Sequence, residues 1–189
     1  MFNCFKPSSG SRYDPINYQL RTVSGKEKRE QIRQPVVSQV FAIGYGSPLG
    51  EDWNRWSLGF QFDSNMYILL EIVPKTEGSK QTKLVATMCG GDIFAVHNRV
   101  APLFIASKGP TVGEYFDLLL EHGRDKYELA DSGAGMAKWV ADAVELFYKQ
   151  RYLASKEQVQ EVLADIEKQW LEHRPTGKRS ALVAGRYLE

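Results

Sequence analysis

Cysteine and a surplus of one charge are what this 189-residue chain has least of. Its two cysteines, Cys4 and Cys89, are too few for the disulfide framework of a small secreted protein. One lies in a polar leader and the other in the body of the chain, so we expect no structural bridge and a reducing compartment, the cytoplasm. A net charge of +1 argues against a broad surface for nucleic acid or for an anionic membrane.

Long hydrophobic runs are also absent. The longest, such as Met66–Leu70, are far shorter than the roughly 20 apolar residues that cross a bilayer. The residues after Met1 contain no apolar run of the kind found in a signal peptide. We therefore expect no membrane span.

Motifs for metals and cofactors are missing as well. His97, His122 and His173 are not spaced as metal ligands with one another or with a cysteine pair. The glycine-rich loop at 132–135 leads into an expected helix, but no Gly-Lys-Ser/Thr follows it and no strong strand precedes it. We interpret it as a flexible helix cap, with anion binding at the helix start as the alternative. The sequence therefore predicts no metal and no cofactor.

Strand patterns fill the first half of the chain. In the clearest of them, Trp56, Leu58 and Phe60 alternate with polar or small residues, which places one set on each face of a sheet. The expected strands are Val36–Tyr45, Arg55–Asp63, Met66–Val73, Lys83–Cys89, Ile93–Val96 and Val100–Ser107. Because they follow one another with turn signals between them, they predict an antiparallel β-meander with one covered face.

About three helices are expected after Pro110. Thr111 and Glu114 form a capping box at the start of the first, and Gly123 is a stop signal at its end. The second begins near Gly135 and the third at Ser155. Strands followed by helices predict an α+β fold.

The end of the chain is expected to complete this domain. The apolar stripe of the third helix extends to Trp170, and Pro175-Thr176-Gly177 ends that helix. Ser180–Tyr187 is expected to return as a last strand. Residues 36–189 are thus predicted to form one α+β domain.

Residues 1–35 are predicted to form a polar N-terminal arm, disordered or with one strand near Tyr18–Val23. The mixed charges of Lys26–Glu30 indicate a solvated turn or a short exposed helix, because two glutamates interrupt the basic residues.

Three short motifs resemble those of an uncharacterised domain family of filamentous fungi. They are Asn54–Leu58, Gly123–Tyr127 and Ser132–Trp139, and the resemblance runs from about Val36 to the end. In that family the first motif usually reads Asn-His-Trp, and a Cys follows Gly-x-Gly in the last. These two residues resemble the dyad of permuted papain-like enzymes, such as relatives of lecithin retinol acyltransferase.

This chain has Arg55 at the position of that His and Met136 at the position of that Cys. A guanidinium cannot serve as a general base, and a thioether is a poor nucleophile, so the resemblance implies that any thiol chemistry has been lost. A pocket could survive, with a soft methionine wall and an Arg to hold an oxyanion. It requires the start of the second helix to meet the tryptophan-bearing strand across a hollow.

Two functions from different classes follow. The first is a cofactor-independent cyclase or isomerase of fungal natural-product metabolism that binds an apolar organic substrate in an aromatic pocket. Its candidate catalytic residues are Arg55, His97, Asp131 and Ser132, and its candidate ligand-binding residues are Trp53, Met136 and Trp139. The alternative is a non-catalytic ligand- or protein-binding module with a degenerate site. A thiol hydrolase using Cys89 is a third reading, which we do not adopt because a lone cysteine at a strand end is more often a small buried hydrophobe.

Overall fold

A computed structural model describes residues 16–17, 26–46, 54–94, 97–106, 109–130, 134–171, 173–179 and 182–188. The predicted strand at Tyr18–Val23 and three candidate residues, Trp53, Asp131 and Ser132, lie outside these ranges. The elements are β1 (Ile16–Asn17), α1 (Lys26–Arg33), β2 (Gln39–Tyr45), β3 (Arg55–Asp63), β4 (Met66–Pro74), β5 (Thr82–Gly90), β6 (Arg99–Leu103), α2 (Val112–Glu121), β7 (Tyr127–Glu128), α3 (Met136–Lys149), α4 (Lys156–Ile166), β8 (Lys168–Leu171), β9 (Arg174–Arg179) and β10 (Arg186–Tyr187).

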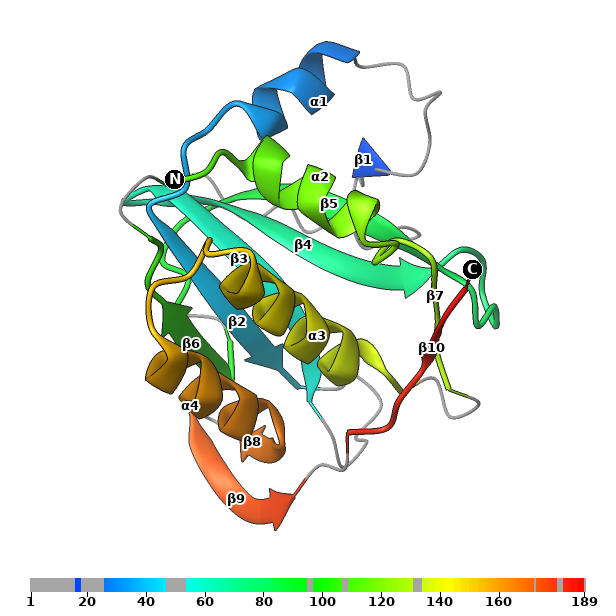
Figure 1. Cartoon of the computed structure of the whole chain (residues 1–189). Coiled ribbons are helices and arrows are strands. Elements are labelled where there is room, and N and C mark those ends of the chain that lie inside the picture. Colours follow the sequence, from blue (N-terminus) through cyan, green and yellow to red (C-terminus); the bar gives the residue numbers. More distant parts are fainter. Residues whose placement is uncertain are drawn as a thin grey trace.

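The predicted α+β fold is confirmed. A six-stranded sheet has the order β1-β5-β4-β3-β2-β6, and all its neighbouring strands are antiparallel. The consecutive strands β2 to β5 form the expected meander. β6 departs from the meander, because it pairs with β2, along the edge opposite β3, instead of pairing with β5. Figure 1 shows α2, α3 and α4 on one side of this sheet.

The main core lies between the sheet and these helices. Alternation along β3 directs Trp56, Leu58 and Phe60 into it, and all three are buried. Phe60 meets two aromatic rings of α2 and α3, Tyr115 at 5.0 Å and Phe147 at 6.2 Å between ring centroids. We call the side of the sheet that faces the helices the helix face and the other side the far face.

The far face is buried as well, so the expectation of a single covered face is wrong. A second apolar cluster lies there, made of Phe41, Ile43, Tyr67, Leu69, Cys89, Ile93 and Val100. Ile93 comes from the segment after β5 and lies against Gly59, where an added Cβ would approach it to 3.3 Å and Ile43 to 2.6 Å. The sequence pattern did not predict this cover, because it comes from a connecting segment.

That segment also explains why the strand predicted at Ile93–Val96 does not form over its described part. Asp92 accepts a hydrogen bond from the backbone N–H of Phe94 at 2.8 Å, which closes a turn through Ile93. Residues 95–96 lie outside the described ranges.

The helix starts agree with the sequence. Thr111 accepts from the N–H of Glu114 at 3.2 Å, and the Glu114 carboxylate accepts from the N–H of Thr111 at 2.6 Å, so the capping box is confirmed. Ser155 caps α4 by accepting from the N–H of Gln158 at 3.2 Å.

The predicted end of the last helix is wrong. α4 ends at Ile166, and Trp170 lies in the β8–β9 hairpin. The reason is a long-range contact: Asn54 accepts from the N–H of Trp170 at 2.6 Å and donates to its C=O at 2.9 Å. A side-chain amide thus satisfies both backbone groups and holds the residue in strand geometry. The expected last strand forms only as β10, paired with β7.

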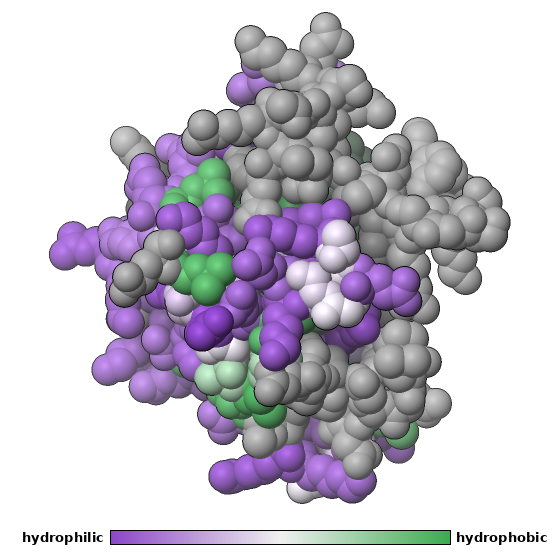
Figure 2. All heavy atoms as spheres, turned by 90° about the vertical axis from the view of Figure 1, so that its right-hand side faces the viewer, coloured by the Kyte–Doolittle hydropathy of each residue, from purple (hydrophilic) through white to green (hydrophobic). Residues whose placement is uncertain are grey.

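α1 packs onto the domain. Ile32 is buried in the main core, and Arg33 forms an ion pair with Asp117 of α2 at 2.5 Å. On the face seen in Figure 2, most described residues are hydrophilic and the hydrophobic ones form small separate patches. None of the helices in the described part of the chain is long and apolar enough to cross a membrane.

Candidate functional site

Polar side chains gather on the far face, where the strands alternate away from the helices. β3 places Arg55 and Ser57 there, and Arg55 is paired with Tyr45 of β2. The β3–β4 register pairs Leu58 with Leu70, and its continuation by one pair places Ser57 beside Glu71 on the far face. The sheet thus brings residues of three adjacent strands to one place.

A hydrogen bond joins the outer two of these strands. The Tyr45 hydroxyl of β2 donates to Glu71 Oε1 of β4, and β3 lies between them. Thr87 of β5 lies on the same face: it is paired with Leu69 and is two residues from Val85, the partner of Glu71. His97, from the segment before β6, adds an imidazole with its ring centroid 6.1 Å from that of Tyr45. We call these six residues the far-face polar cluster: Tyr45, Arg55, Ser57, Glu71, Thr87 and His97.

Unsatisfied hydrogen-bonding capacity distinguishes this cluster. Seven buried side-chain polar atoms of the described residues have no hydrogen-bond partner, and the cluster holds five of them. The five atoms are Arg55 Nε, Ser57 Oγ, Glu71 Oε2, Thr87 Oγ1 and His97 Nε2. Native proteins pair the large majority of buried polar atoms, and each unpaired one costs about 1–3 kcal/mol. The five unpaired atoms on this face are hydrogen-bonding capacity that a bound ligand or ordered water would satisfy.

The pKa of Glu71 is shifted by its surroundings. Its side chain lies in an otherwise apolar strand and the residue is 5% exposed. Burial raises the pKa of its carboxyl above the ordinary 4.5, while the hydrogen bond from Tyr45 and the positive charge of Arg55 act in the opposite direction. Glu71 therefore keeps its proton to higher pH than a solvated glutamate.

His97 is shifted in the other sense. Burial, and secondarily the positive charge of His173, lower the pKa of His97 from 6.5 to about 4. At neutral pH its imidazole is uncharged, and a neutral imidazole can accept a proton or a hydrogen bond. The cluster thus combines a carboxyl with a raised pKa, a neutral imidazole and a cation.

The structure brings together two of the candidates from the sequence analysis, Arg55 and His97, and separates them from two others. Met136 is buried in the main core on the helix face, whereas Arg55 faces the far side of the sheet. Trp139 is fully buried, and its indole N–H donates to the C=O of Arg124 at 2.7 Å. Arg55 and Met136 therefore lie on opposite sides of the sheet and cannot line the one hollow that the sequence analysis expected. Trp53, Asp131 and Ser132 lie outside the described residues.

The motifs that suggested a family have structural contacts. Trp139 and Arg124 join two of them, and Tyr127 also donates to the C=O of Gly135 at 3.2 Å. The Tyr127 hydroxyl accepts from the N–H of Gly185 at 2.9 Å, which ties the C-terminal segment to the same place. Asn54 of the first motif holds Trp170 in β8. Cys89, the thiol of the third reading, is buried in the second apolar cluster.

Sequence reasoning missed Tyr45, Ser57, Glu71 and Thr87. The available signal was Glu71, a single carboxylate within the apolar run Ile68–Val73. A carboxylate in a fully buried strand is rare unless it is paired. The other three residues could not be found without the strand register that places them beside it.

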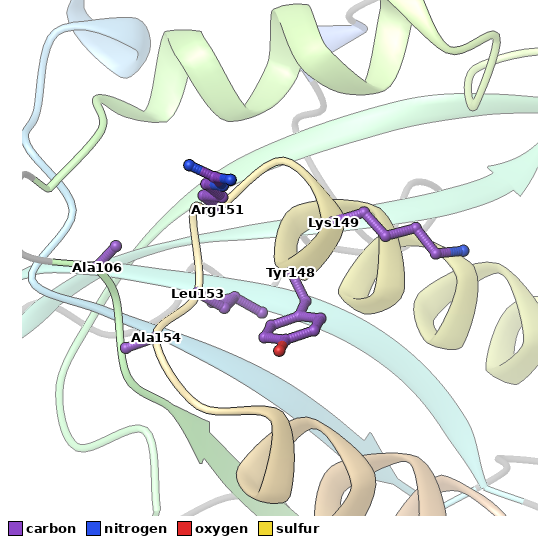
Figure 3. A pocket seen from close by; sticks show the side chains of 6 residues that line it. All are labelled: Ala106, Tyr148, Lys149, Arg151, Leu153 and Ala154. Atoms are coloured by element: carbon purple, nitrogen blue, oxygen red, sulfur yellow. The ribbon is translucent and has the colours of Figure 1, made fainter.

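A surface groove of about 430 Å³ lies at the C-terminal end of α3, lined by Ala106, Tyr148, Lys149, Arg151, Leu153 and Ala154. Figure 3 shows the long side chains of Lys149 and Arg151 pointing in different directions, away from Tyr148. Their charges do not converge on one point, so we place the candidate site at the far-face polar cluster.

Comparison with known proteins gives one match. The family model described as "Domain of unknown function (DUF7770)" matches residues 43–188, a range that includes the whole far-face polar cluster. No curated protein and no solved structure matches the chain. In the described part of the chain, no group of three or more His, Cys, Asp or Glu residues could hold a metal ion.

Proposed function

The chain belongs to the family described as a domain of unknown function (DUF7770), and we propose that it is an enzyme that isomerises or cyclises a small organic molecule by proton transfer, without a cofactor. The observation that carries the proposal is Glu71: a buried carboxyl with a raised pKa and an unpartnered Oε2, in one cluster with a neutral His97.

Proton-transfer catalysis needs an acid that is protonated and a base that is not, at the same pH. A solvated glutamate and histidine have the opposite order, because the carboxyl loses its proton first. Here burial raises the pKa of Glu71 and lowers that of His97 to about 4. The two shifts move the pair toward the order that the chemistry requires.

The reaction can be written with these residues alone. His97 Nε2 accepts a proton from a carbon next to a substrate carbonyl, and the C–H electron pair forms an enolate. Protonated Glu71 Oε2 donates a hydrogen bond to the enolate oxygen, and Arg55 supplies positive charge nearby. In an isomerisation the imidazolium returns the proton to a different carbon. In a cyclisation the enolate carbon attacks a second carbonyl carbon of the same molecule, whose oxygen takes the proton. Neither route changes the oxidation level or consumes a co-reactant.

The apolar surroundings support an organic substrate. Ile43, Tyr67 and Leu69 lie on the same face of the sheet as the cluster. Natural-product metabolism in filamentous fungi belongs to this proposal as well, and its support is the motif resemblance.

A non-catalytic ligand-binding module is the second candidate. It is favoured by Ser57 Oγ and Thr87 Oγ1, two unpartnered hydroxyls that can bind a ligand without taking part in proton transfer. It predicts a ligand that binds to the cluster and leaves unchanged.

Hydrogen exchange in D₂O tests the proposal without knowledge of the natural substrate. The protein is incubated with a panel of ketones, diketones and keto acids, and deuterium uptake at carbon is followed by mass spectrometry. We expect uptake into at least one compound, and a loss of roughly 100-fold or more in Glu71→Gln and in His97→Gln. The matched control is Glu77→Gln, since Glu77 is an exposed carboxylate on the β4–β5 turn.

The proposal is overturned if no compound exchanges above the uncatalysed rate, or if Glu71→Gln exchanges as fast as the wild type. Binding without exchange would favour the second candidate.

A further inference from the structure

Arg55 is a cation with an unused hydrogen-bond donor, as expected of a residue that binds an anion. It lies at the start of β3, half-buried, with its Nε–H buried and without a hydrogen-bond partner. Ser57, two residues along the same face, has an unpartnered hydroxyl. A guanidinium offers several N–H donors in a planar fork that matches a carboxylate, and a hydroxyl can donate beside it.

Other charges around this point do not satisfy Arg55 fully. Glu71 is close enough for the two charges to attract, but burial opposes the ionised form of Glu71. Tyr45 faces the same carboxyl from β2, and His97 lies beside Tyr45. On β5, the partner of Glu71 is the apolar Val85, and Lys83 is two residues further along that strand. When Glu71 holds its proton, the charge of Arg55 is left without a counter-charge from these groups.

We propose that the ligand of the far-face polar cluster is an organic carboxylate held by Arg55 and Ser57, and that Glu71 Oε2 takes up one proton from solvent on binding at any pH where Glu71 is ionised in the unliganded protein. The inference rests on the proposed function, because it places the substrate among the same side chains. No carbon bond forms or breaks in this step.

The coupling follows from one cation serving two carboxylates. Before binding, the charge of Arg55 lowers the pKa of Glu71. A bound carboxylate takes over that charge and adds its own negative charge beside Glu71, and two carboxylates that share a site cannot both stay ionised easily. The new proton also gives Glu71 a hydrogen-bond donor to direct at the ligand. Where Glu71 is ionised in the unliganded protein, binding therefore restores the protonated acid that the proposed reaction uses.

The ligand body is expected to be apolar. Ile43, Leu69 and Val100 are buried on the same face, so the surroundings of the cluster are hydrocarbon and suit a ligand without a second charge. Aliphatic and aromatic monocarboxylic acids are the ligand class that fits.

Isothermal titration calorimetry of the full chain tests this inference. The probes are monocarboxylates paired with their neutral primary amides, such as benzoate with benzamide, titrated from acidic to weakly alkaline pH in buffers of different ionisation enthalpy. We expect carboxylates to bind roughly 10-fold to 100-fold more tightly than their amides. The dependence of the binding enthalpy on the buffer gives the number of protons taken up per ligand. This number should approach about one as pH rises and Glu71 of the unliganded protein becomes ionised.

Two variants assign the roles. Arg55→Gln should lose the preference for carboxylate over amide, and Arg55→Lys, which keeps the charge, should retain part of it. Glu71→Gln should still bind the carboxylate, without proton uptake. Circular dichroism spectra that match the wild type show that each variant is folded.

Equal binding of carboxylates and amides, failure of every carboxylate to bind, or undiminished proton uptake in Glu71→Gln would overturn the inference. Its failure is distinct from that of the proposed function. Carboxylate binding without hydrogen exchange would leave this inference standing and overturn the enzyme. Exchange of neutral ketones with equal binding of amides would do the reverse.

Discussion

Tyr45 on β2 donates a hydrogen bond to Glu71 on β4, across the strand that lies between them. Neighbouring strands are about 4.8 Å apart, so this contact spans two strand spacings. It fixes one carboxylate oxygen of Glu71 and leaves the other, Oε2, without a partner. The carboxyl is thus held in place by one oxygen, and its other oxygen can bind a ligand, which supports our choice of Glu71 as the centre of the site.

The first prediction concerns the stability of Glu71→Gln. Because the folded-state pKa of Glu71 is raised above 4.5, the folded protein holds this proton after the unfolded chain has lost it. Stability is therefore lost as pH rises from about 4.5 toward the folded-state pKa, by about 1.4 kcal/mol for each pH unit that separates the folded and unfolded pKa values. Glutamine does not titrate, so Glu71→Gln should be close to the wild type in acid and gain on it as pH rises.

Urea unfolding at a series of pH values measures this difference. Other titrating groups, His97 among them, are present in both proteins and largely cancel in the comparison. A difference that stays constant across the series would contradict the raised pKa of Glu71.

The second prediction concerns Asn54, which forms two hydrogen bonds with the backbone of Trp170. Asn54→Ala leaves the buried N–H of Trp170 without this acceptor and should cost about 1–3 kcal/mol. Asn98 also donates to the C=O of Trp170, at 3.3 Å, so Asn98→Ala is a matched control with a smaller expected loss. Hydrogen exchange of the Trp170 amide should become faster in Asn54→Ala only. The same exchange rate of the Trp170 amide in the wild type, Asn54→Ala and Asn98→Ala would contradict the role given to Asn54.

The third prediction compares the ends of two helices. Both α2 and α3 end with a residue in the left-handed region, Gly123 at φ 64° and Arg151 at φ 61°. In each case the N–H groups of this residue and the next one close the helix, with Arg151 donating to Tyr148 and Tyr152 donating to Phe147 in α3. Glycine adopts this conformation without strain, whereas arginine does so at a cost.

Arg151→Gly should therefore stabilise the protein by up to about 1 kcal/mol, and Gly123→Ala should destabilise it by about 1 kcal/mol. Arg151→Ala separates backbone strain from charge, since it removes the guanidinium but keeps a Cβ, and it should bring no gain. Thermal unfolding measures all three. A loss of stability in Arg151→Gly would mean that the arginine side chain makes a contact worth more than the strain.

Local signals in the sequence predicted much of this fold. The box of Thr111 and Glu114, the stop at Gly123 and the alternation along β3 depend on neighbouring residues alone, and each has the expected result. Trp170 shows why other features could not be predicted. Trp170 continues the apolar spacing of the third expected helix, but hydrogen bonds with Asn54, 116 residues away, place it in β8 instead.

The site followed the same division. Arg55 became a candidate through the family resemblance and His97 through its residue type, whereas Tyr45 and Glu71 are recognised as neighbours only from the register of β2, β3 and β4. Periodicity assigns a residue to a face of a strand but does not say which residues of other strands lie beside it.

The far face of the sheet holds an acid and a base whose pKa values are shifted in opposite directions: that of Glu71 is raised and that of His97 is lowered. Nuclear magnetic resonance measures both in one titration, through the side-chain carboxyl carbon of Glu71 and the ring of His97. We predict that Glu71 titrates above its ordinary 4.5 and His97 near 4, so that the carboxyl still holds its proton when the imidazole has lost its own. A Glu71 that titrates at or below 4.5, with His97 near 6.5, would contradict the account.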